Sequence, residues 1–290
     1  MAATASSLTG YAPQHPHLWE ASPGGPPIWD GARVDDAVEV VPGVWSLPLL
    51  STAAAREVNR ELTALQAWQA AAAPDARVDP SALHGDGFLL SIGGGDGVHV
   101  LSALRALVAA HVIPFARRVG LAAARAAAAA ADDDDDDDID ADDFVAFFLR
   151  YEAAGARDGD DESGMDFHED LSSVTVDLCL GGDGCADDDA DDGAAAVTSF
   201  VGGDLVIRGA GDGDAHTHVK QRAGHAIVFA GGRTPHSASP VLAGTRCNVV
   251  LWLVTRGERR RLMRHSRSDA RTFAHVYRDY LSLRNLDPST

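Results

Sequence analysis

Residues 166–181, DFHEDLSSVTVDLCLG, join a short polar segment to an apolar run rich in β-branched residues. The run 173–180 has the composition of a buried β-strand. His168 and Asp170 stand two positions apart just before this run. In an extended segment, residues i and i+2 point to the same side, so both side chains can face one ligand while Glu169 points away. The stretch therefore predicts a strand that begins beside a candidate metal-binding pair.

An H-x-D pair is a weak signal by itself, because a chain with 12 histidines and 43 acidic residues contains such pairs by chance. Downstream, GGRTPHSASPV adds His236, and LAGTRCNVVLW adds Arg246. Two histidines and one carboxylate form the facial triad that holds non-haem Fe(II), with positions left open for substrate and dioxygen. Arginine binds a carboxylate through two parallel hydrogen bonds, so Arg246 suits a dicarboxylate co-substrate. The set predicts an oxygenase dependent on Fe(II) and 2-oxoglutarate.

These residues also have ordinary structural interpretations. The H-x-D pair could lie on a surface turn, and Arg246 could be an exposed arginine at a strand end. We expect His236 and Arg246 to reach one pocket as the first residues of adjacent antiparallel strands. His216 and His218 share the i, i+2 spacing. No third ligand is apparent near them in the sequence, so an exposed strand is their better interpretation.

The pattern of the whole chain predicts an α+β fold: a double-stranded β-helix (jelly roll) core with flanking N-terminal helices. Short apolar runs separated by Gly/Asp turns indicate the core strands. We expect strands at 144–151, 173–180, 204–208, 216–221, 225–230 and 246–254, with a further short strand within 87–93. We expect helices over 53–72, 98–119 and 269–284. Ser51 or Thr52 can cap the first helix, and Pro114 should kink or break the second.

Composition and pattern together divide the chain into five segments. They are an irregular N-terminal arm, a helical flank of the catalytic domain, an Ala/Asp low-complexity insert, the dioxygenase jelly roll and a C-terminal helical tail. Their expected boundaries are 1–43, 44–121, 122–143, 144–256 and 257–290.

The net charge of −19 is concentrated in two aspartate-rich tracts, 132–138 and 183–192. A chain this acidic repels nucleic acid and acidic membrane surfaces, so we expect neither as a partner. Dense like charges repel one another and offer nothing to bury, so the tracts are best interpreted as solvated inserts. A docking tail or a loose Ca²⁺ site is the alternative.

Other features bear on where the protein works. The chain has only three cysteines, which do not make a disulfide framework. No apolar run approaches the roughly 20 residues that a membrane span needs, and the N-terminus has neither a basic start nor an apolar core. We therefore expect an intracellular protein, cytoplasmic or nuclear, without a signal peptide or transmembrane segment.

Five segments between Phe144 and Val254 resemble, in the right order, the catalytic domain of 2-oxoglutarate oxygenases of the prolyl-4-hydroxylase and lysyl-hydroxylase types. Within these, they resemble most the Fe2OG dioxygenase domain-containing protein 2-like group. The segments are FFLRYE, DFHEDLSSVTVDLCLG, FVGGDLVI, GHAIVFAGGRTPHSASPVLAGTR and CNVVLWL. Upstream, PGVWSLPLLS and DPSALHGDGFLLSIG extend the similarity.

This resemblance implies that His168, Asp170 and His236 bind Fe(II) and that Arg246 binds the distal carboxylate of 2-oxoglutarate. Tyr151 falls where many relatives place a tyrosine beside the co-substrate; a core aromatic residue at a strand end is the alternative. The implied reaction consumes O2, hydroxylates a substrate and releases succinate and CO2. L-ascorbate is implied as a further cofactor.

The implied substrate is a peptidyl prolyl or lysyl residue. A small-molecule substrate, or a non-catalytic jelly-roll interaction module, is the alternative. Asp177 departs from the asparagine that the group often has, and the loop 181–196 is longer than usual. We expect apolar walls around the metal from Leu178, Val250 and Phe229.

Overall fold

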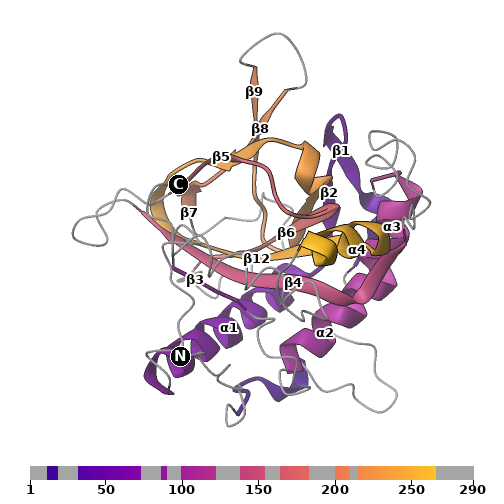
Figure 1. Ribbon diagram of the computed structural model, residues 1–290. Coiled ribbons are helices and arrows are strands. Elements are labelled where there is room, and N and C mark those ends of the chain that lie inside the picture. Colours follow the sequence, from indigo (N-terminus) through magenta and orange to yellow (C-terminus); the bar gives the residue numbers. More distant parts are fainter. Residues whose placement is uncertain are drawn as a thin grey trace.

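The computed structural model describes residues 12–18, 32–72, 86–89, 99–121, 138–153, 164–182, 200–209 and 215–265. Within them, two antiparallel β-sheets face each other and helices cover the outer side of the larger sheet (Figure 1). This mostly antiparallel architecture with few helices is consistent with the jelly-roll core expected from the sequence.

The larger sheet, here the major sheet, has the strand order β1-β2-β10-β6-β12-β4-β3, with β7 added along β12. Its strands are β1 (Val38–Val41), β2 (Val44–Pro48), β3 (Asp86–Leu89), β4 (Ile139–Glu152), β6 (Val174–Gly181), β7 (Phe200–Gly202), β10 (His225–Phe229) and β12 (Val241–Thr255). The minor sheet has the order β5-β11-β8-β9. Its strands are β5 (Met165–His168), β8 (Leu205–Arg208), β9 (His216–Val219) and β11 (His236–Ala238).

Helix α1 (Thr52–Ala72) lies against β6 on the outer side of the major sheet. Its start confirms the expected cap, because the Ser51 hydroxyl accepts the N–H of Ala54 at 3.1 Å. The remaining helical elements are α2 (His99–Leu107), a π-helical turn (Val108–Val112), α3 (Ile113–Arg118), α4 (Arg256–His265) and three 3₁₀ turns (Pro16–Leu18, Val34–Asp36 and Gly231–Arg233).

The helix expected over 98–119, with a kink or break at Pro114, is divided into α2, a π-helical turn and α3. The chain continues from α2 into α3 through the π-helical turn, in which the Ile113 N–H bonds the Val108 carbonyl five residues earlier. Proline has no N–H to donate, and a widened turn just before it accommodates the missing bond without ending the helix. Pro114 itself lies in the first turn of α3.

The major sheet has an apolar outer face because alternate residues of its central strands point toward the helices. On β6 these are Val174, Val176, Leu178 and Leu180, all buried in the same core as α1 residues Val58 and Leu62. Residues of opposite parity on β6 and β12 face the minor sheet. The helices therefore bury one side of the sheet, and the other side is left to form the interior between the two sheets.

Two strands are longer than expected. β4 begins at Ile139, inside the range 122–143 expected to be a low-complexity insert. Ile139 is buried and pairs with Thr255, and Asp140 forms an ion pair with Arg259 at 3.6 Å, so an acidic composition conceals a real strand. β12 begins at Val241 rather than at 246, because its first residues pair with β7.

Four short strands, β1, β2, β5 and β7, were not expected, and β11 was expected only as a strand that begins at His236. β1 lies within the range 1–43 expected to be an irregular arm, and it pairs with β2. Runs of three to five residues are too short to show a period in the sequence, so pairing partners define them. The expected helix 269–284 and most of the two acidic tracts lie outside the described residues.

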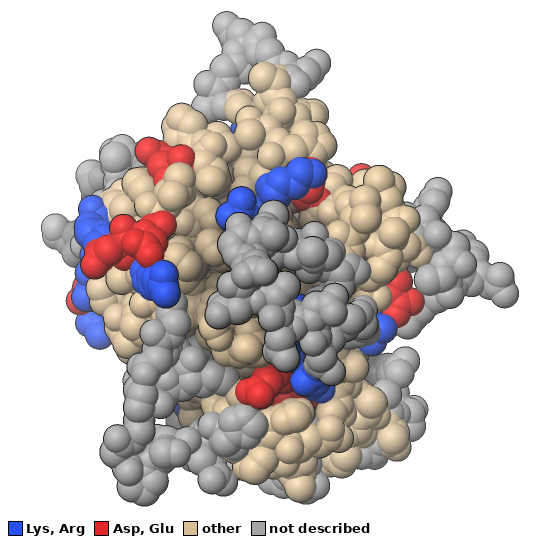
Figure 2. All heavy atoms as spheres, turned by 180° about the vertical axis from the view of Figure 1, so that it is seen from behind, with Lys and Arg blue, Asp and Glu red and all other residues tan. Residues whose placement is uncertain are grey.

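Charged side chains of the described residues lie in small mixed groups on the face shown in Figure 2. Arg117 pairs with Asp138 at 2.6 Å and Arg118 with Asp35 at 2.7 Å.

In the part of the chain that the structure covers, no helix is long and apolar enough to cross a membrane.

Gly224 provides a test of this architecture, because its backbone connects three segments. Its N–H bonds the Cys179 carbonyl, and its carbonyl accepts the N–H groups of Leu49 and Leu50. It has φ +83°, and an added Cβ would lie 2.3 Å from the Leu50 carbonyl oxygen. We expect Gly224→Ala to lower the free energy of unfolding by about 3 kcal/mol, combining a left-handed conformation with a backbone clash.

The matched control is Gly120→Ala. Gly120 has a similar φ of +73° after α3, but an added Cβ would meet nothing within 4 Å. This variant should lose only about 1 kcal/mol in urea unfolding. Equal losses at the two positions would contradict the close packing at Gly224.

Candidate metal centre

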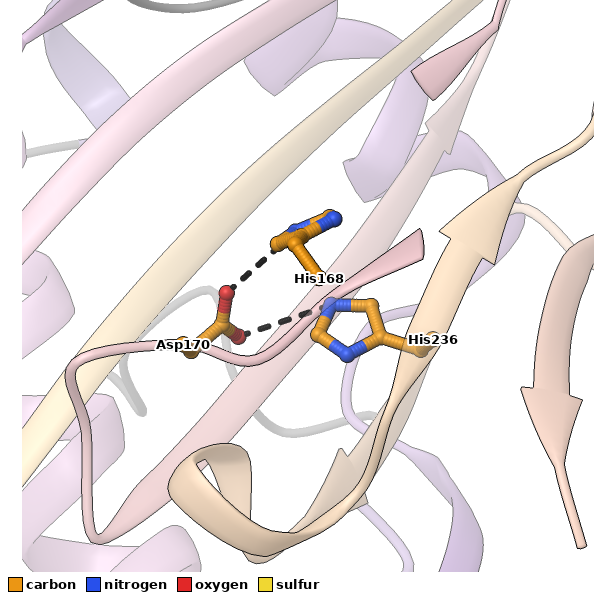
Figure 3. A group of neighbouring side chains, drawn as sticks. All are labelled: His168, Asp170 and His236. Carbon is orange, nitrogen blue, oxygen red and sulfur yellow. Dashed lines mark ion pairs between the residues drawn. The ribbon is translucent and has the colours of Figure 1, made fainter. Parts of the chain in front are cut away.

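Antiparallel pairing between β5 and β11 places two histidines side by side. His168 ends β5, and its register partner is His236, the first residue of β11. Asp170 follows β5 by two residues and turns back toward both rings (Figure 3). Its two carboxylate oxygens lie 3.5 Å from His168 Nε2 and 3.6 Å from His236 Nε2. One ligand atom from each residue falls within 4.8 Å of the others, as in a three-residue metal site.

Backbone hydrogen bonds decide which nitrogen of each ring faces the centre. His168 Nδ1 lies 2.8 Å from the Asp166 carbonyl oxygen, and His236 Nδ1 lies 2.8 Å from that of Thr234. A carbonyl oxygen only accepts, so each Nδ1 carries the proton and donates it. Each Nε2 then keeps its lone pair, directed at the centre of the group. This is the tautomer that a metal requires of both ligands.

The Asp170 carboxylate is held from behind by two buried hydroxyl groups. Thr175 Oγ1 donates to Asp170 Oδ2 at 2.5 Å, and Ser172 Oγ lies 2.7 Å from Thr175 Oγ1. The Asp170 N–H also bonds the Gly231 carbonyl. An added Cβ at Gly231 would lie 1.9 Å from Ser172 Oγ and 2.5 Å from Thr175 Oγ1. Only glycine therefore fits against the hydroxyl pair.

The pKa values of the two histidines are shifted in opposite directions. Burial lowers the pKa of His168, but the hydrogen bonds that its protonated ring makes to Asp170 and to the Asp166 carbonyl outweigh burial, and the net pKa is raised above 6.5. Deeper burial dominates at His236 and lowers its pKa below 6.5, although the charge of Asp170 acts against this. His168 is the more exposed ring, with 34% of its side chain accessible against 7% for His236.

Arg246 and Tyr151 form a second buried group on the inner face of the major sheet. They are register partners on β12 and β4, and the guanidinium carbon lies 4.3 Å from the centre of the tyrosine ring. Arg246 also donates a hydrogen bond to the Gly203 carbonyl. Burial raises the pKa of Tyr151 to about 12, and the nearby Arg246 charge opposes this rise. Tyr151 is therefore protonated at neutral pH.

The structure groups His168, Asp170 and His236, and it places Arg246 against Tyr151, but the strands that carry His236 and Arg246 differ from those expected. His236 lies on β11 of the minor sheet, whereas Arg246 lies within β12 of the major sheet. They are therefore not at the starts of adjacent strands, because β12 pairs with β4 and β6 instead of with β11. The sequence step from His236 to Arg246 crosses from one sheet to the other.

One expected apolar wall is wrong. Leu178 points outward into the core shared with the helices, because it has the same parity as its outward-facing neighbours on β6. Phe229 does contact the centre, with its ring 4.8 Å from that of His236. Val250 lies on the inner side, against Phe147 and its neighbours. The two histidines of β9 are exposed, as expected.

The hydroxyl pair and Gly231 were not predicted as parts of the site. Thr175 follows Asp170 by five residues and has the parity of the inner face, so strand alternation alone could have found it. Ser172 and Gly231 had no comparable signal, because their positions depend on how a turn after β10 packs against a turn before β6.

Removing the Thr175 hydroxyl tests its role in holding Asp170. Thr175→Val keeps the shape but leaves Asp170 Oδ2 without its donor, and we expect divalent-metal affinity to fall about tenfold to a hundredfold. Titration with Co(II), followed by its visible absorption, measures this. Thr217→Val, on the exposed strand β9, is the control and should not change affinity. Unchanged affinity in Thr175→Val would show that the hydroxyl does not orient the ligand.

The opposite pKa shifts predict how metal binding depends on pH. A metal binds only neutral imidazole, so binding must displace the proton from His168 once pH falls through its raised pKa, above 6.5. His236 has a lowered pKa, because of its burial, and so takes up a proton only at lower pH than His168. Once the pH is below the His168 pKa, apparent Co(II) affinity should therefore fall about tenfold per pH unit, because one proton competes with the metal. A hundredfold fall per unit would mean that both rings are protonated together.

Comparisons with known proteins give only distant similarity. No protein-family model matches the chain, and no curated protein matches it. Among solved structures, a Pseudomonas putida prolyl-4-hydroxylase is similar at 18% identity and a TM-score of 0.44, over 74% of this chain and 93% of that one. A Trichoplax adhaerens prolyl hydroxylase, in complex with a hypoxia inducible factor peptide fragment, is similar at 17% identity and a TM-score of 0.44, over 75% of this chain and 86% of that one. A Burkholderia pseudomallei oxidoreductase of the 2OG-Fe(II) oxygenase family is similar at 15% identity and a TM-score of 0.34, over 54% of this chain and 56% of that one.

Proposed function

We propose that this chain is a dioxygenase that uses Fe(II) and 2-oxoglutarate to hydroxylate a substrate, releasing succinate and CO2. The observation that carries the proposal is the convergence of two Nε2 atoms and one carboxylate on a single point. Both histidines already use Nδ1 on backbone carbonyls, so their free nitrogens face that point. Two nitrogens and one oxygen on one side of an ion are the ligand set of non-haem Fe(II) oxygenases.

The donor set fits Fe(II), and three protein ligands leave coordination positions for a co-substrate and O2. His168, Asp170 and His236 would hold the ion. Bound there, Fe(II) supplies the redox chemistry that couples O2 to oxidation of 2-oxoglutarate and substrate. The protein's own part is to fix the ligand directions, and the Thr175 hydroxyl does this for Asp170.

Arg246 is proposed to pair with the distal carboxylate of 2-oxoglutarate. A planar guanidinium can give two parallel hydrogen bonds to a carboxylate, which fixes orientation as well as charge. The Tyr151 ring lies against the guanidinium and limits its movement. Because Tyr151 stays protonated, its hydroxyl is able to donate a hydrogen bond to the same carboxylate.

Substrate binding is the less constrained part of the proposal. A peptidyl prolyl or lysyl residue is proposed from the resemblance of the sequence segments to hydroxylases that act on such residues. A small-molecule substrate is the second candidate within the same chemistry. A role for L-ascorbate also comes from the resemblance alone.

The first experiment needs no substrate. Fe(II) and 2-oxoglutarate are added anaerobically to purified protein, and the weak visible charge-transfer band of the chelate is recorded. We expect the band in the wild type, its loss in His236→Ala, and an affinity for 2-oxoglutarate about tenfold lower in Arg246→Lys, which keeps the charge but not the two-pronged geometry.

The control for the histidine variant is His218→Ala, which removes an exposed histidine of the minor sheet and should leave the band unchanged. Thermal unfolding of each variant shows whether it is folded. A folded wild type without the band would refute the dioxygenase proposal and favour a non-catalytic jelly-roll interaction module. With the band present, succinate release in the presence of proline- or lysine-containing peptides then tests the substrate class.

A further inference from the structure

Three buried polar side chains lie between the metal-ligand end of the sheet and Arg246. They are Asp177 on β6, Asn248 on β12 and Gln221 in the segment between β9 and β10; we call them the polar cluster. In the register of the β6–β12 pair, Asp177 lies opposite Val250. Cys179, two residues further along β6, lies opposite Asn248. Thr175, which holds Asp170, is one inner-face position from Asp177 on β6.

Within the polar cluster, the Asp177 carboxylate accepts side-chain hydrogen bonds from two amide groups. Asn248 Nδ2 donates to Asp177 Oδ1 at 2.5 Å, and Gln221 Nε2 donates to Asp177 Oδ2 at 2.7 Å. Both carboxylate oxygens are acceptors, which fixes the orientation of the two amides. Among the residues that the structure describes, no cation forms an ion pair with Asp177. A buried negative charge is therefore held in place but not neutralised by direct contact.

Arg246 and Asp177 act on the same surroundings. Burial is the main cause that raises the pKa of Tyr151 and of Cys179 to about 12. Beyond burial, the Arg246 charge lowers both pKa values and the Asp177 charge raises both. The two opposite charges therefore share one interior region, although they do not touch.

Two buried polar atoms in this region have no hydrogen-bond partner among the described residues. They are Nε of Arg246, a donor, and Oδ1 of Asn248, an acceptor. The two residues are two positions apart on β12 and so face the same interior. Binding sites for polar ligands commonly present buried polar atoms that have no hydrogen-bond partner in the protein.

We propose that Asp177 determines the affinity and charge selectivity of the co-substrate site, a proposal that rests on the function proposed above. A dicarboxylate drawn to Arg246 brings its distal negative charge into the interior that already contains the Asp177 carboxylate. Repulsion between the two opposes binding. A 2-oxo acid of the same length without a distal carboxylate meets less repulsion. Asp177 therefore reduces the preference of the site for the dianion over this monoanion.

The test compares two 2-oxo acids in a charge-removing variant. Asp177→Asn preserves shape, and rotation of the Gln221 amide lets the three side chains remain hydrogen bonded. Dissociation constants of 2-oxoglutarate and of 2-oxopentanoate are measured anaerobically from the Fe(II) chelate band. We expect 2-oxoglutarate to bind about tenfold more tightly in Asp177→Asn, and 2-oxopentanoate to change less than about threefold.

Asp177→Ser removes the same charge with a smaller side chain and should shift the ratio of the two constants in the same direction. The control is Asp140→Asn, a charge removal at the end of β4 away from Tyr151, which should leave both constants unchanged. A band in the wild type with an unchanged or reversed ratio in both Asp177 variants overturns this inference alone. No band in the folded wild type overturns the proposed function and this inference with it.

Discussion

Antiparallel pairing of β5 with β11 is the contact on which the candidate metal centre depends. It brings His168 beside His236, although many residues and several strands separate them along the chain. The Asp166 carbonyl in β5 and the Thr234 carbonyl just before β11 accept the Nδ1 protons of the two rings. Strand pairing therefore sets the two rings side by side, and the local backbone of each histidine sets its tautomer. Asp170 needs a separate support, which the Thr175 hydroxyl and the close approach of Gly231 provide.

The major sheet separates two environments by the parity of its residues. Outward positions on β6 and β12 are apolar and pack against helices, whereas inward positions include Thr175, Asp177, Arg246 and Asn248. A slip of one residue in either strand would exchange these sets, placing charges in the helix-facing core. The apolar core on one side thus enforces the register that assembles the polar interior on the other.

Much of the site could be predicted from the sequence, because metal ligands must be specific residue types at specific spacings. The H-x-D pair alone was a weak signal, and His236 together with the resemblance of five segments to known oxygenases completed the prediction of the three clustered residues. The short strands could not be predicted, since pairing partners rather than local pattern define them. The start of β4 at Ile139 was hidden by aspartates, and Pro114 was accommodated by a π-helical turn that no local rule indicates. Leu178 was expected beside the metal, on the inner face of the major sheet, but it lies on the outer face.

β5 has only four residues, and among the residues that the structure describes it lies at the edge of the minor sheet, paired with β11 alone. Short edge strands open locally far more often than a whole domain unfolds. Opening of β5 would withdraw His168 and leave Asp170 and His236 in place. The rate at which a bound ion escapes would then follow fraying of this strand rather than global unfolding. A bound ion would in turn slow amide hydrogen exchange across β5, linking occupancy of the centre to the dynamics of one edge of the fold.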